Sequence, residues 1–367
     1  MTSAPQLQTE RRQGTDGPLL DVTDLKTHFR SERGLVRAVD GVTFSLQRGK
    51  SLGVVGESGS GKTVLSRTIM GLLPSTAVLS GSVRFAGQEV LGLDSRQLRH
   101  LWGREMSMVF QNPMVSLNPL MRVGHQIAEP LQIHLGMDKP AALEYAVKLL
   151  DDVRIPEPHK RVRQYPHELS GGMRQRVMIA IAMACGPTLL FADEPTTALD
   201  VTVQAQILEL INEQRQERNM SVVLVTHDLG VVAGHTDEIA VMYGGRLVEK
   251  APTKQLFANM KMPYTKSLMR SIPRLEDASH TRLLTIPGRP PDLVNPPSGC
   301  RFAPRCAYAR ERCTVEEPPL VTAPGTSDHT YACWYPVGSP EFAERDEQIM
   351  NDLAAGTVAA SASRAAG

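Results

Sequence analysis

Residues 51–63 read SLGVVGESGSGKT, and this stretch predicts a strand, a glycine-rich turn and the start of a helix. The apolar run Ser51–Val55 is typical of a buried parallel strand. The next eight residues match the pattern G-x-x-x-x-G-K-S/T in full. Glycines let backbone N–H groups curl around phosphate oxygens, and the helix N-terminus adds partial positive charge. Lys62 is expected to bridge phosphate oxygens, and the Thr63 hydroxyl to bind Mg²⁺. The predicted phosphate loop comprises Gly56, Ser58, Gly59, Ser60, Gly61, Lys62 and Thr63.

Two further apolar runs, residues 188–192 and Ser221–Thr226, also indicate parallel strands. The first of them is followed directly by Asp193 and Glu194, which places two carboxylates at the edge of the sheet where open α/β folds bind ligands. We expect Asp193 to join the magnesium shell and Glu194 to accept a proton from an attacking water. Together with the loop, these runs predict the α/β fold of a P-loop nucleoside triphosphatase.

The composition is that of an ordinary globular protein. The chain has 367 residues, of which 41% are hydrophobic and 22% charged, which excludes a disordered, collagen-like or coiled-coil chain. No apolar run is long enough to span a membrane, and the N-terminus does not have the form of a secretory signal, so we expect a soluble intracellular protein. A net charge of +1 and 5% aromatic residues disfavour a nucleic-acid ATPase, which needs a basic stripe and stacking aromatics.

Residues 169–176 read LSGGMRQR, and this segment resembles the signature sequence of ATP-binding-cassette (ABC) ATPases. Other elements of that family follow in order along the chain. Gln111 in VFQNP resembles the Q-loop glutamine, residues 198–200 (ALD) resemble the D-loop, and His227 in LVTHD resembles the switch histidine.

One further resemblance concerns the base of the nucleotide. Phe29 resembles the aromatic residue that stacks on adenine in this family, and His28 is an alternative for that role. The resemblance to ABC ATPases covers about residues 19–250.

The family resemblance implies a RecA-like core, an inserted helical subdomain at about residues 112–176, and hydrolysis of Mg²⁺·ATP between two ATPase subunits. Ser170, Gly171 and Gly172 of one subunit would close on the γ-phosphate held by the other. Gln111 would bind Mg²⁺ and, with His227, position the water that Glu194 activates, and Asp200 would border the same ATP. Because these elements are intact, the sequence disfavours a regulatory cassette that binds ATP without hydrolysing it.

The segment after Gln111, NPMVSLNPLMRVG, resembles the Q-D-P-x-x-S-L-N-P stretch of the ATPases of dipeptide/oligopeptide importers, with Asn112 in place of Asp. Residues 263–274, 284–293 and 297–313 resemble the C-terminal region of the same family, which also includes nickel importers. The chain carries one phosphate loop, one signature and no fused membrane domain. The resemblance therefore implies an importer ATPase for peptides, with nickel or another small solute as the alternative cargo.

Four segments are expected along the chain. They are a flexible tail (1–17), the ABC nucleotide-binding domain (18–260), a C-terminal extension (261–337) and a second flexible tail (338–367). Within the extension, residues 284–336 are expected to be a separate small unit held together by something other than its own core. The resemblance implies a second ATPase subunit (a paralogue in many family members), two transmembrane permease subunits and an extracytoplasmic solute-binding protein. It also implies a peripheral position on the cytoplasmic face of the membrane.

Four of the five cysteines lie in the C-terminal extension. Cys300, Cys306, Cys313 and Cys333 lack the closely spaced pairs of structural zinc sites and match neither common ferredoxin pattern. Members of the resembled family carry a four-iron, four-sulfur (4Fe–4S) cluster here, which the resemblance implies for this chain; zinc and free or oxidised thiols remain alternatives. Arg301, Arg305 and Arg310 either offset the negative charge of such a cluster or are solvated. Cys185 lies in an apolar run and is expected in the core.

Overall fold

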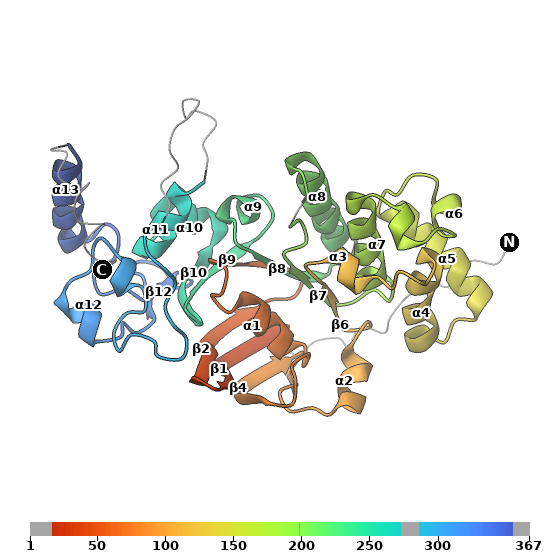
Figure 1. Ribbon diagram of the computed structural model, residues 1–367, viewed down its shortest axis with the longest axis horizontal. Helices are drawn as coiled ribbons and strands as arrows, with labels where there is room; N and C mark the ends of the chain where they lie inside the picture. The colour runs from red at the N-terminus through yellow and green to blue at the C-terminus, as the bar shows by residue number, and fades with distance from the viewer. Residues whose placement is uncertain (1–16, 198, 273–285, 355–367) are drawn as a thin grey trace.

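The computed structural model describes residues 17–197, 199–272 and 286–354, and a central β-sheet runs through the middle of the molecule (Figure 1). Its strand order is β11-β12-β10-β9-β3-β8-β7-β6, and the strands from β9 to β6 are parallel. The strands of this sheet are β3 (Ser51–Val55), β6 (Met106–Val109), β7 (Leu189–Asp193), β8 (Ser221–Thr226), β9 (Glu238–Tyr243), β10 (Arg246–Pro252), β11 (Val321–Thr322) and β12 (Thr330–Tyr331). The three strands predicted from the sequence are therefore present, with β7 beginning one residue later than expected.

A second, antiparallel sheet has the order β2-β1-β4-β5. Helix α1 (Lys62–Ile69), which follows the phosphate loop, contacts β1, β2 and β7 and so lies between the two sheets. The strands of the second sheet are β1 (Leu20–Ser31), β2 (Gly34–Leu46), β4 (Ala77–Phe85) and β5 (Gln88–Glu89).

The central sheet separates two hydrophobic cores because its strands are buried on both faces. In β8, Val222 and Leu224 belong to one core, and Val223 and Val225 belong to the other. Side chains alternate between the faces of a strand, so a continuous apolar run is what such a strand requires.

Helices surround the central sheet, and α3 to α7 gather at one end of the molecule (Figure 1). Helix α7 packs on α3, α4, α5 and α8. The remaining helices are α2 (Ser95–Leu101), α3 (Pro113–Ser116), α4 (Val123–Leu135), α5 (Lys139–Asp152), α6 (Pro158–Arg161), α7 (Gly171–Met183), α8 (Val201–Arg218), α9 (Leu229–Ala233), α10 (Thr253–Asn259), α11 (Pro263–Arg270), α12 (Glu311–Val315) and α13 (Pro340–Ala354), with 3₁₀ turns at Pro166–Glu168 and Ala303–Arg305.

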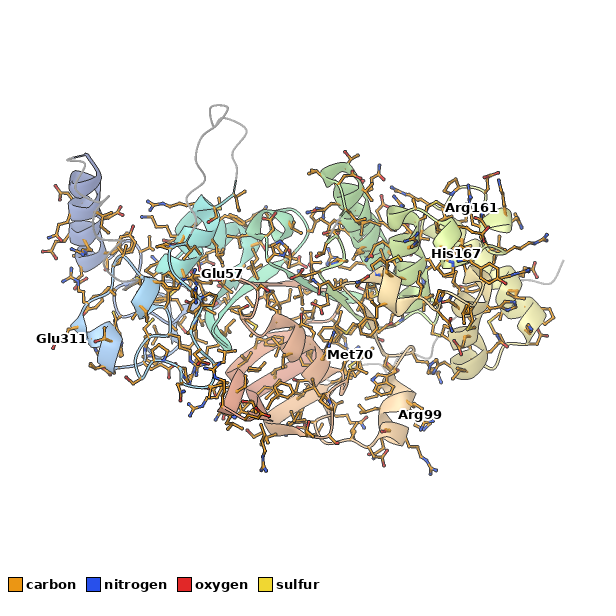
Figure 2. All side chains as sticks on the ribbon, in the orientation of Figure 1. Glu57, Met70, Arg99, Arg161, His167 and Glu311 are labelled. Carbon is orange, nitrogen blue, oxygen red and sulfur yellow. The ribbon has the colours of Figure 1, made fainter. Side chains whose placement is uncertain are left out.

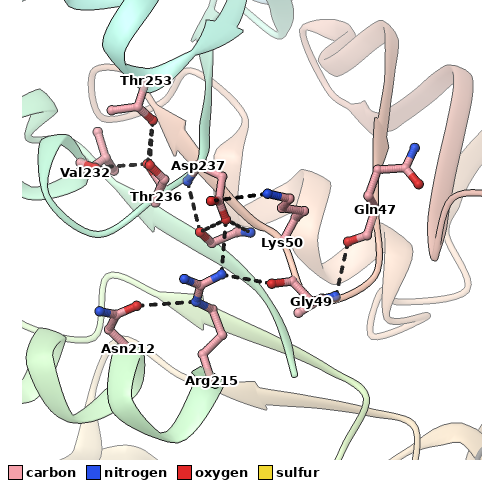
Figure 3. A network of polar contacts seen from close by, with 11 residues as sticks. Gln47, Gly49, Lys50, Asn212, Arg215, Val232, Thr236, Asp237 and Thr253 are labelled. Atoms are coloured by element: carbon pink, nitrogen blue, oxygen red, sulfur yellow. Dashed lines mark hydrogen bonds and ion pairs between the residues drawn. The ribbon is translucent and has the colours of Figure 1, made fainter. Parts of the chain in front are cut away.

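A polar network fixes the end of β3 that is remote from the phosphate loop (Figure 3). The Asp237 carboxylate accepts hydrogen bonds from the backbone N–H and the hydroxyl of Ser51, both at 2.8 Å, and lies 3.1 Å from Arg215 Nη1. Arg215 also donates to the Gly49 carbonyl at 2.9 Å. The network therefore connects α8 to the strand that leads into the phosphate loop.

The C-terminal extension is joined to the ATPase domain rather than separate from it. Strand β12 pairs with β10 in antiparallel register, Glu249 opposite Tyr331 and Lys250 opposite Thr330. Phe302 is buried in the same core as residues of β8 and α7. The expectation of a separate small unit is therefore wrong, because the segment extends the central sheet and shares its core.

The predicted flexible tail from residue 338 onward is also wrong in its first part, where α13 forms. Phe342 on this helix stacks on Tyr308, with ring centroids 4.2 Å apart, and is buried. Helix α13 is therefore held in place by Tyr308, which belongs to the preceding extension. Residues 1–16 and 355–367 of the predicted tails lie outside the described residues. Within the described part of the chain, no helix combines the length and apolar character that a membrane crossing needs.

Candidate functional site

The phosphate loop connects β3 to α1, and its glycines are required by close backbone contacts. A Cβ atom on Gly61 would lie 2.2 Å from the Ala38 carbonyl oxygen, and one on Gly56 would lie 2.2 Å from that of Met242. Gly61 also has a φ of +100°, in the region that favours glycine. The loop thus has the tight backbone curvature that the sequence pattern predicts.

Lys62 is buried at the start of α1 and turns back onto the loop. Its Nζ atom donates to the carbonyls of Gly56 at 2.7 Å and Glu57 at 3.0 Å. Burial lowers the pKa of Lys62 below its ordinary value, while the charges of Glu194, Asp193 and Glu57 oppose this shift. A buried ammonium among carboxylates and carbonyls is suited to hold phosphate oxygens.

Thr63 and Asp193 lie side by side, although 130 residues separate them in sequence. The Thr63 hydroxyl donates to Asp193 Oδ1 at 3.1 Å. Burial raises the pKa of Asp193, and the hydrogen bond from Thr63 opposes that rise. A hydroxyl and a carboxylate at the phosphate loop are oxygen ligands of the kind that Mg²⁺ prefers, so the pair fits the predicted magnesium site.

Gln111, Glu194 and His227 come together from three neighbouring strands. Gln111 Nε2 donates to Glu194 Oε2 at 2.9 Å, and His227 Nδ1 lies 3.5 Å from Glu194 Oε1. Each residue follows the carboxyl end of its strand, namely β6, β7 and β8. Glu194 has a φ of +47°, which is uncommon for a residue other than glycine, and such strain clusters at functional sites.

Thr197 is a further member of this group that the sequence analysis did not identify. Its hydroxyl donates to Glu194 Oε2 at 2.8 Å, so the same carboxylate oxygen accepts from both Thr197 and Gln111. Thr197 follows Glu194 by three residues, and this short spacing is the feature of the sequence that could have indicated their contact. These contacts hold the carboxylate in one orientation.

The signature residues stand at the N-terminus of α7, which lies with α4 to α6, away from α1 (Figure 1). The Ser170 hydroxyl accepts from the backbone N–H of Met173 at 3.3 Å, and both Ser170 and Gly171 are exposed. Asp200 caps α8 by accepting from the Val203 N–H at 2.9 Å. Ala198, the first residue of the predicted D-loop, lies outside the described residues.

Phe29 and His28 occupy different surroundings on β1. His28 Nε2 lies 3.0 Å from Asp40 Oδ1, and Arg301 forms an ion pair with the other oxygen of that carboxylate. The His28 ring is therefore held by Asp40, whereas Phe29 is half-buried. This arrangement favours Phe29 over His28 for stacking on an adenine ring.

The four cysteines of the extension line one hollow, together with Phe302 and Tyr308. Backbone N–H groups donate to three of the sulfurs: from Phe302 and Ala303 to Cys300, from Tyr308 to Cys306, and from Tyr335 to Cys333. Burial raises the pKa of Cys300 to about 11 and that of Cys306 to about 12. Across residues 17–197, 199–272 and 286–354, no group of three or more His, Cys, Asp or Glu side chains is arranged to hold a metal ion.

Two of the three arginines singled out in this region are not solvated. Arg301 and Arg305 are buried and form ion pairs with Asp40 and Glu57. Arg310 pairs with Glu344 at 2.8 Å. Cys185 is buried, as expected, and its sulfur lies 3.4 Å from the Pro130 carbonyl oxygen.

Comparison with known proteins agrees with this geometry. Residues 39–197 match the sequence model of the ABC transporter family, and residues 248–313 match that of the oligopeptide/dipeptide transporter C-terminal region. The oligopeptide transport ATP-binding protein OppD of Haemophilus influenzae is 50% identical over 83% of this chain and 94% of its own length. OppD of Salmonella typhimurium is 50% identical over 87% of this chain and 94% of its own length.

Solved structures also match. A dimeric ATP-binding cassette, in a post-hydrolysis state bound to ADP and Pi, is 26% identical, with a TM-score of 0.58 over 64% of this chain and 98% of that one. One assignment follows from the two family matches and the near relatives. It agrees with the arrangement of the phosphate loop, Glu194 and the signature. The chain belongs to the oligopeptide/dipeptide transporter family of ABC ATPases, which couple ATP hydrolysis to transport.

Proposed function

We propose that this protein is the ATP-hydrolysing subunit of an importer that takes up oligopeptides across the cytoplasmic membrane. The observation that carries the proposal is the convergence of Gln111, Thr197 and His227 on the Glu194 carboxylate beside the phosphate loop. The relatives named for oligopeptide transport supply the substrate class.

Each residue of the site has a role in hydrolysis. The loop from Gly56 to Thr63 holds the phosphates, and Phe29 stacks on adenine. Glu194 accepts a proton from the attacking water, while Gln111 and His227 orient that water and the carboxylate. Thr63 and Asp193, with Gln111, would hold the Mg²⁺ ion, which supplies charge neutralisation at the phosphates when it is bound.

The second ATPase subunit is part of this proposal. Ser170 is the N-cap of α7, and Gly171 and Gly172 are its first residues. The first N–H groups of a helix have no partner within the helix, and a helix N-terminus is a site for anions. In a closed pair of subunits these groups, with Asp200, would contact the γ-phosphate of ATP bound by the partner. The dimeric cassette among the structural matches supports this arrangement, and the partner would be a paralogue or a second copy.

The surface that follows Gln111 is proposed to contact the permease subunits at the cytoplasmic face of the membrane. Met114, Val115 and Leu120 are 62%, 82% and 86% exposed. Large exposed apolar side chains gathered on one segment mark interaction sites. Because these side chains directly follow Gln111, closure of the ATP site would move them and so act on the membrane subunits. Those subunits would receive the peptide from an extracytoplasmic binding protein.

The C-terminal cysteines are proposed to hold a 4Fe–4S cluster with a structural role. A cluster binds one thiolate at each of its irons, so its ligands surround a hollow rather than converge on one ion. The hollow lined by Cys300, Cys306, Cys313 and Cys333, and the backbone N–H groups directed at three of the sulfurs, support this proposal. When bound, the cluster would cross-link the extension.

Replacing Glu194 tests the catalytic assignment. Glu194→Gln should still bind ATP, form an ATP-dependent dimer in size-exclusion chromatography, and lose about 10²–10⁴-fold in phosphate release. Glu209→Gln, an exposed change on α8, is the matched control and should keep normal turnover. Unchanged phosphate release by Glu194→Gln would refute the assignment.

Uptake measurements test the substrate. Cells that lack this protein should regain uptake of a labelled tripeptide when they express the unchanged chain, but not when they express Lys62→Ala. Restored uptake of labelled nickel without uptake of the peptide would favour the nickel-importer alternative.

A further inference from the structure

Glu57, the second residue of the phosphate loop, is bonded to the C-terminal extension through its carboxylate. Arg305 donates to both carboxylate oxygens, from Nη1 at 2.5 Å and from Nη2 at 2.9 Å. Figure 2 shows Glu57 close to the extension, which is drawn in blue. The two residues are 248 positions apart in sequence, so the contact depends on the folded extension.

Arg305 occupies a site in which all five of its N–H donors are used. Besides Glu57, it donates to the Tyr243 hydroxyl at 3.2 Å, to the Ile286 carbonyl at 3.2 Å and to the Pro287 carbonyl at 2.9 Å. Its side chain is 4% exposed. A guanidinium has five donors in a rigid fork, so full satisfaction fixes its position as well as its charge.

The backbone of Glu57 is bonded to the same region. Its N–H donates to the hydroxyl of Tyr264 at 2.9 Å. Tyr264 is fully buried and packs on Phe302, with ring centroids 5.2 Å apart. Phe302 in turn lines the hollow of the four cysteines.

The remaining polar group of Glu57 faces the phosphate-binding lysine. Its carbonyl accepts from Lys62 Nζ at 3.0 Å, and the charge of its carboxylate acts on Lys62. Glu57 is therefore hydrogen-bonded to Arg305 through its carboxylate, to Tyr264 through its N–H and to Lys62 through its carbonyl. An unpaired carboxylate at this point of the loop would repel the phosphates of a nucleotide.

We propose that Arg305 and Tyr264 are positioning residues for nucleotide binding, which act through Glu57 and make ATP affinity depend on the packing of the C-terminal extension. Arg305 neutralises and anchors the Glu57 carboxylate, and Tyr264 fixes the peptide that precedes the phosphate cradle. The inference rests on the proposed function, since it takes residues 56–63 as the ATP site.

The experiment measures binding of fluorescent N-methylanthraniloyl-ATP with Mg²⁺ by the purified full-length chain. Arg305→Gln should raise the Kd about five- to tenfold, within the usual range for coupling between sites. Glu57→Gln loses the anchor but leaves no unpaired carboxylate, so it should raise the Kd by a smaller factor. The double variant should not exceed Arg305→Gln, because the two side chains act as one unit. Arg310→Gln is a matched change in the same extension. Arg310 pairs with Glu344 rather than with Glu57, so this variant should keep the Kd within about twofold of that of the unchanged chain.

Steady-state kinetics distinguish positioning from general damage. Arg305→Gln should raise KM for ATP in parallel with the Kd and keep kcat within about threefold. Among the residues that the structure describes, Arg305 has no hydrogen bond or ion pair with Gln111, Glu194 or His227. Unchanged Kd and KM in a variant that circular dichroism shows to be folded would overturn the inference. If the unchanged chain itself did not bind the analogue, the proposed function would fail and this inference with it.

A second pair of variants covers the case in which Arg305→Gln does not fold. Tyr264→Phe removes only the hydroxyl that accepts from Glu57 and should weaken binding about threefold or more. Tyr308→Phe is its control: Tyr308 lines the same hollow, but its hydroxyl donates to Asp346 on α13 at 2.6 Å. Equal Kd values for these two variants would also overturn the inference.

Discussion

Gln111 Nε2 lies 2.9 Å from Glu194 Oε2, so the residue that begins the exposed apolar segment also holds the carboxylate that we propose as the catalytic base. The contact crosses from the end of β6 to the end of β7. Movement of the segment after Gln111 would therefore act directly on the proposed catalytic carboxylate. This contact is our proposed route by which transport is coupled to hydrolysis.

The first prediction concerns Gln111 itself. Gln111→Ala should lower kcat for ATP hydrolysis at least about tenfold, but by less than the 10²–10⁴-fold expected for loss of the base. The reason is that Thr197 still donates to Glu194 in this variant. Phosphate release measures the effect, and Gln132→Ala, whose amide donates within α4, is the control. A Gln111→Ala variant with normal kcat would contradict the role given to this contact.

The second prediction concerns magnesium. Thr63→Val removes the hydroxyl that lies 3.1 Å from Asp193 Oδ1 and keeps the shape of the side chain. We expect at least about tenfold more Mg²⁺ to be needed for half-maximal ATPase activity, because one oxygen ligand is lost. Thr63→Ser should retain most of the affinity. Equal magnesium dependence in Thr63→Val and Thr63→Ser would argue against the hydroxyl as a ligand.

The third prediction concerns iron. Cys306→Ser should lower the iron and sulfide content of anaerobically purified protein well below the roughly four of each per chain expected for a 4Fe–4S cluster. Elemental analysis and a visible absorption spectrum measure the outcome. Cys185→Ser, a buried cysteine outside the hollow, should keep the full content. Zinc in the unchanged chain, or no metal, would contradict the cluster.

The fourth prediction concerns acid stability at Asp237. Although burial opposes the shift, hydrogen bonds from Ser51 and the charges of Arg215 and Lys50 hold the pKa of this carboxylate below its ordinary value. The ionised form is therefore favoured in the folded protein. Its stabilisation is present above the unfolded-state pKa of about 3.9 and is lost as pH falls through the lower folded-state value.

Asp237→Asn should accordingly lower the free energy of unfolding by about 1–3 kcal/mol at neutral pH. The difference between the variant and the unchanged chain should shrink below about pH 4. Urea titrations at several pH values measure both effects. A difference that stays constant between pH 7 and pH 3 would rule out ionisation as its cause.

The fifth prediction concerns the junction between the extension and the ATPase domain. The buried Glu249 carboxylate accepts from the backbone N–H groups of Lys261 and Met262, and lies 2.8 Å from His329 Nε2. Glu249→Ala leaves these donors without a partner and should cost about 3 kcal/mol or more. Glu238→Ala breaks only the partly exposed pair with Lys250 and should cost about 1 kcal/mol or less. Equal thermal shifts for the two variants would contradict this explanation.

Much of the ATP site could be predicted from the sequence because each of its elements is local. The phosphate loop lies in one continuous segment, and Gln111, Glu194 and His227 each follow a predicted or apolar strand. Parallel strands bring their carboxyl ends to one edge of a sheet, so short motifs far apart in the chain meet there.

The contacts of the extension could not be predicted in the same way. Arg305 and Glu57 have no periodic pattern between them, and a surface arginine would show the same local sequence. Helix α13 was missed because its apolar anchor Phe342 meets Tyr308 only in the folded chain. Such contacts depend on how irregular segments pack. The hydrophobic periodicity of strands and helices does not predict that packing.

The pairing of β12 with β10 has a consequence for the order in which the chain folds during synthesis. Until Tyr331 has left the ribosome, β10 is the outermost strand of its sheet, with unpaired backbone groups along one side. Unpaired strand edges are templates for association with other chains. A ribosome that stalled before this residue would release a product prone to aggregate, although the phosphate loop, Glu194 and His227 had already been synthesised.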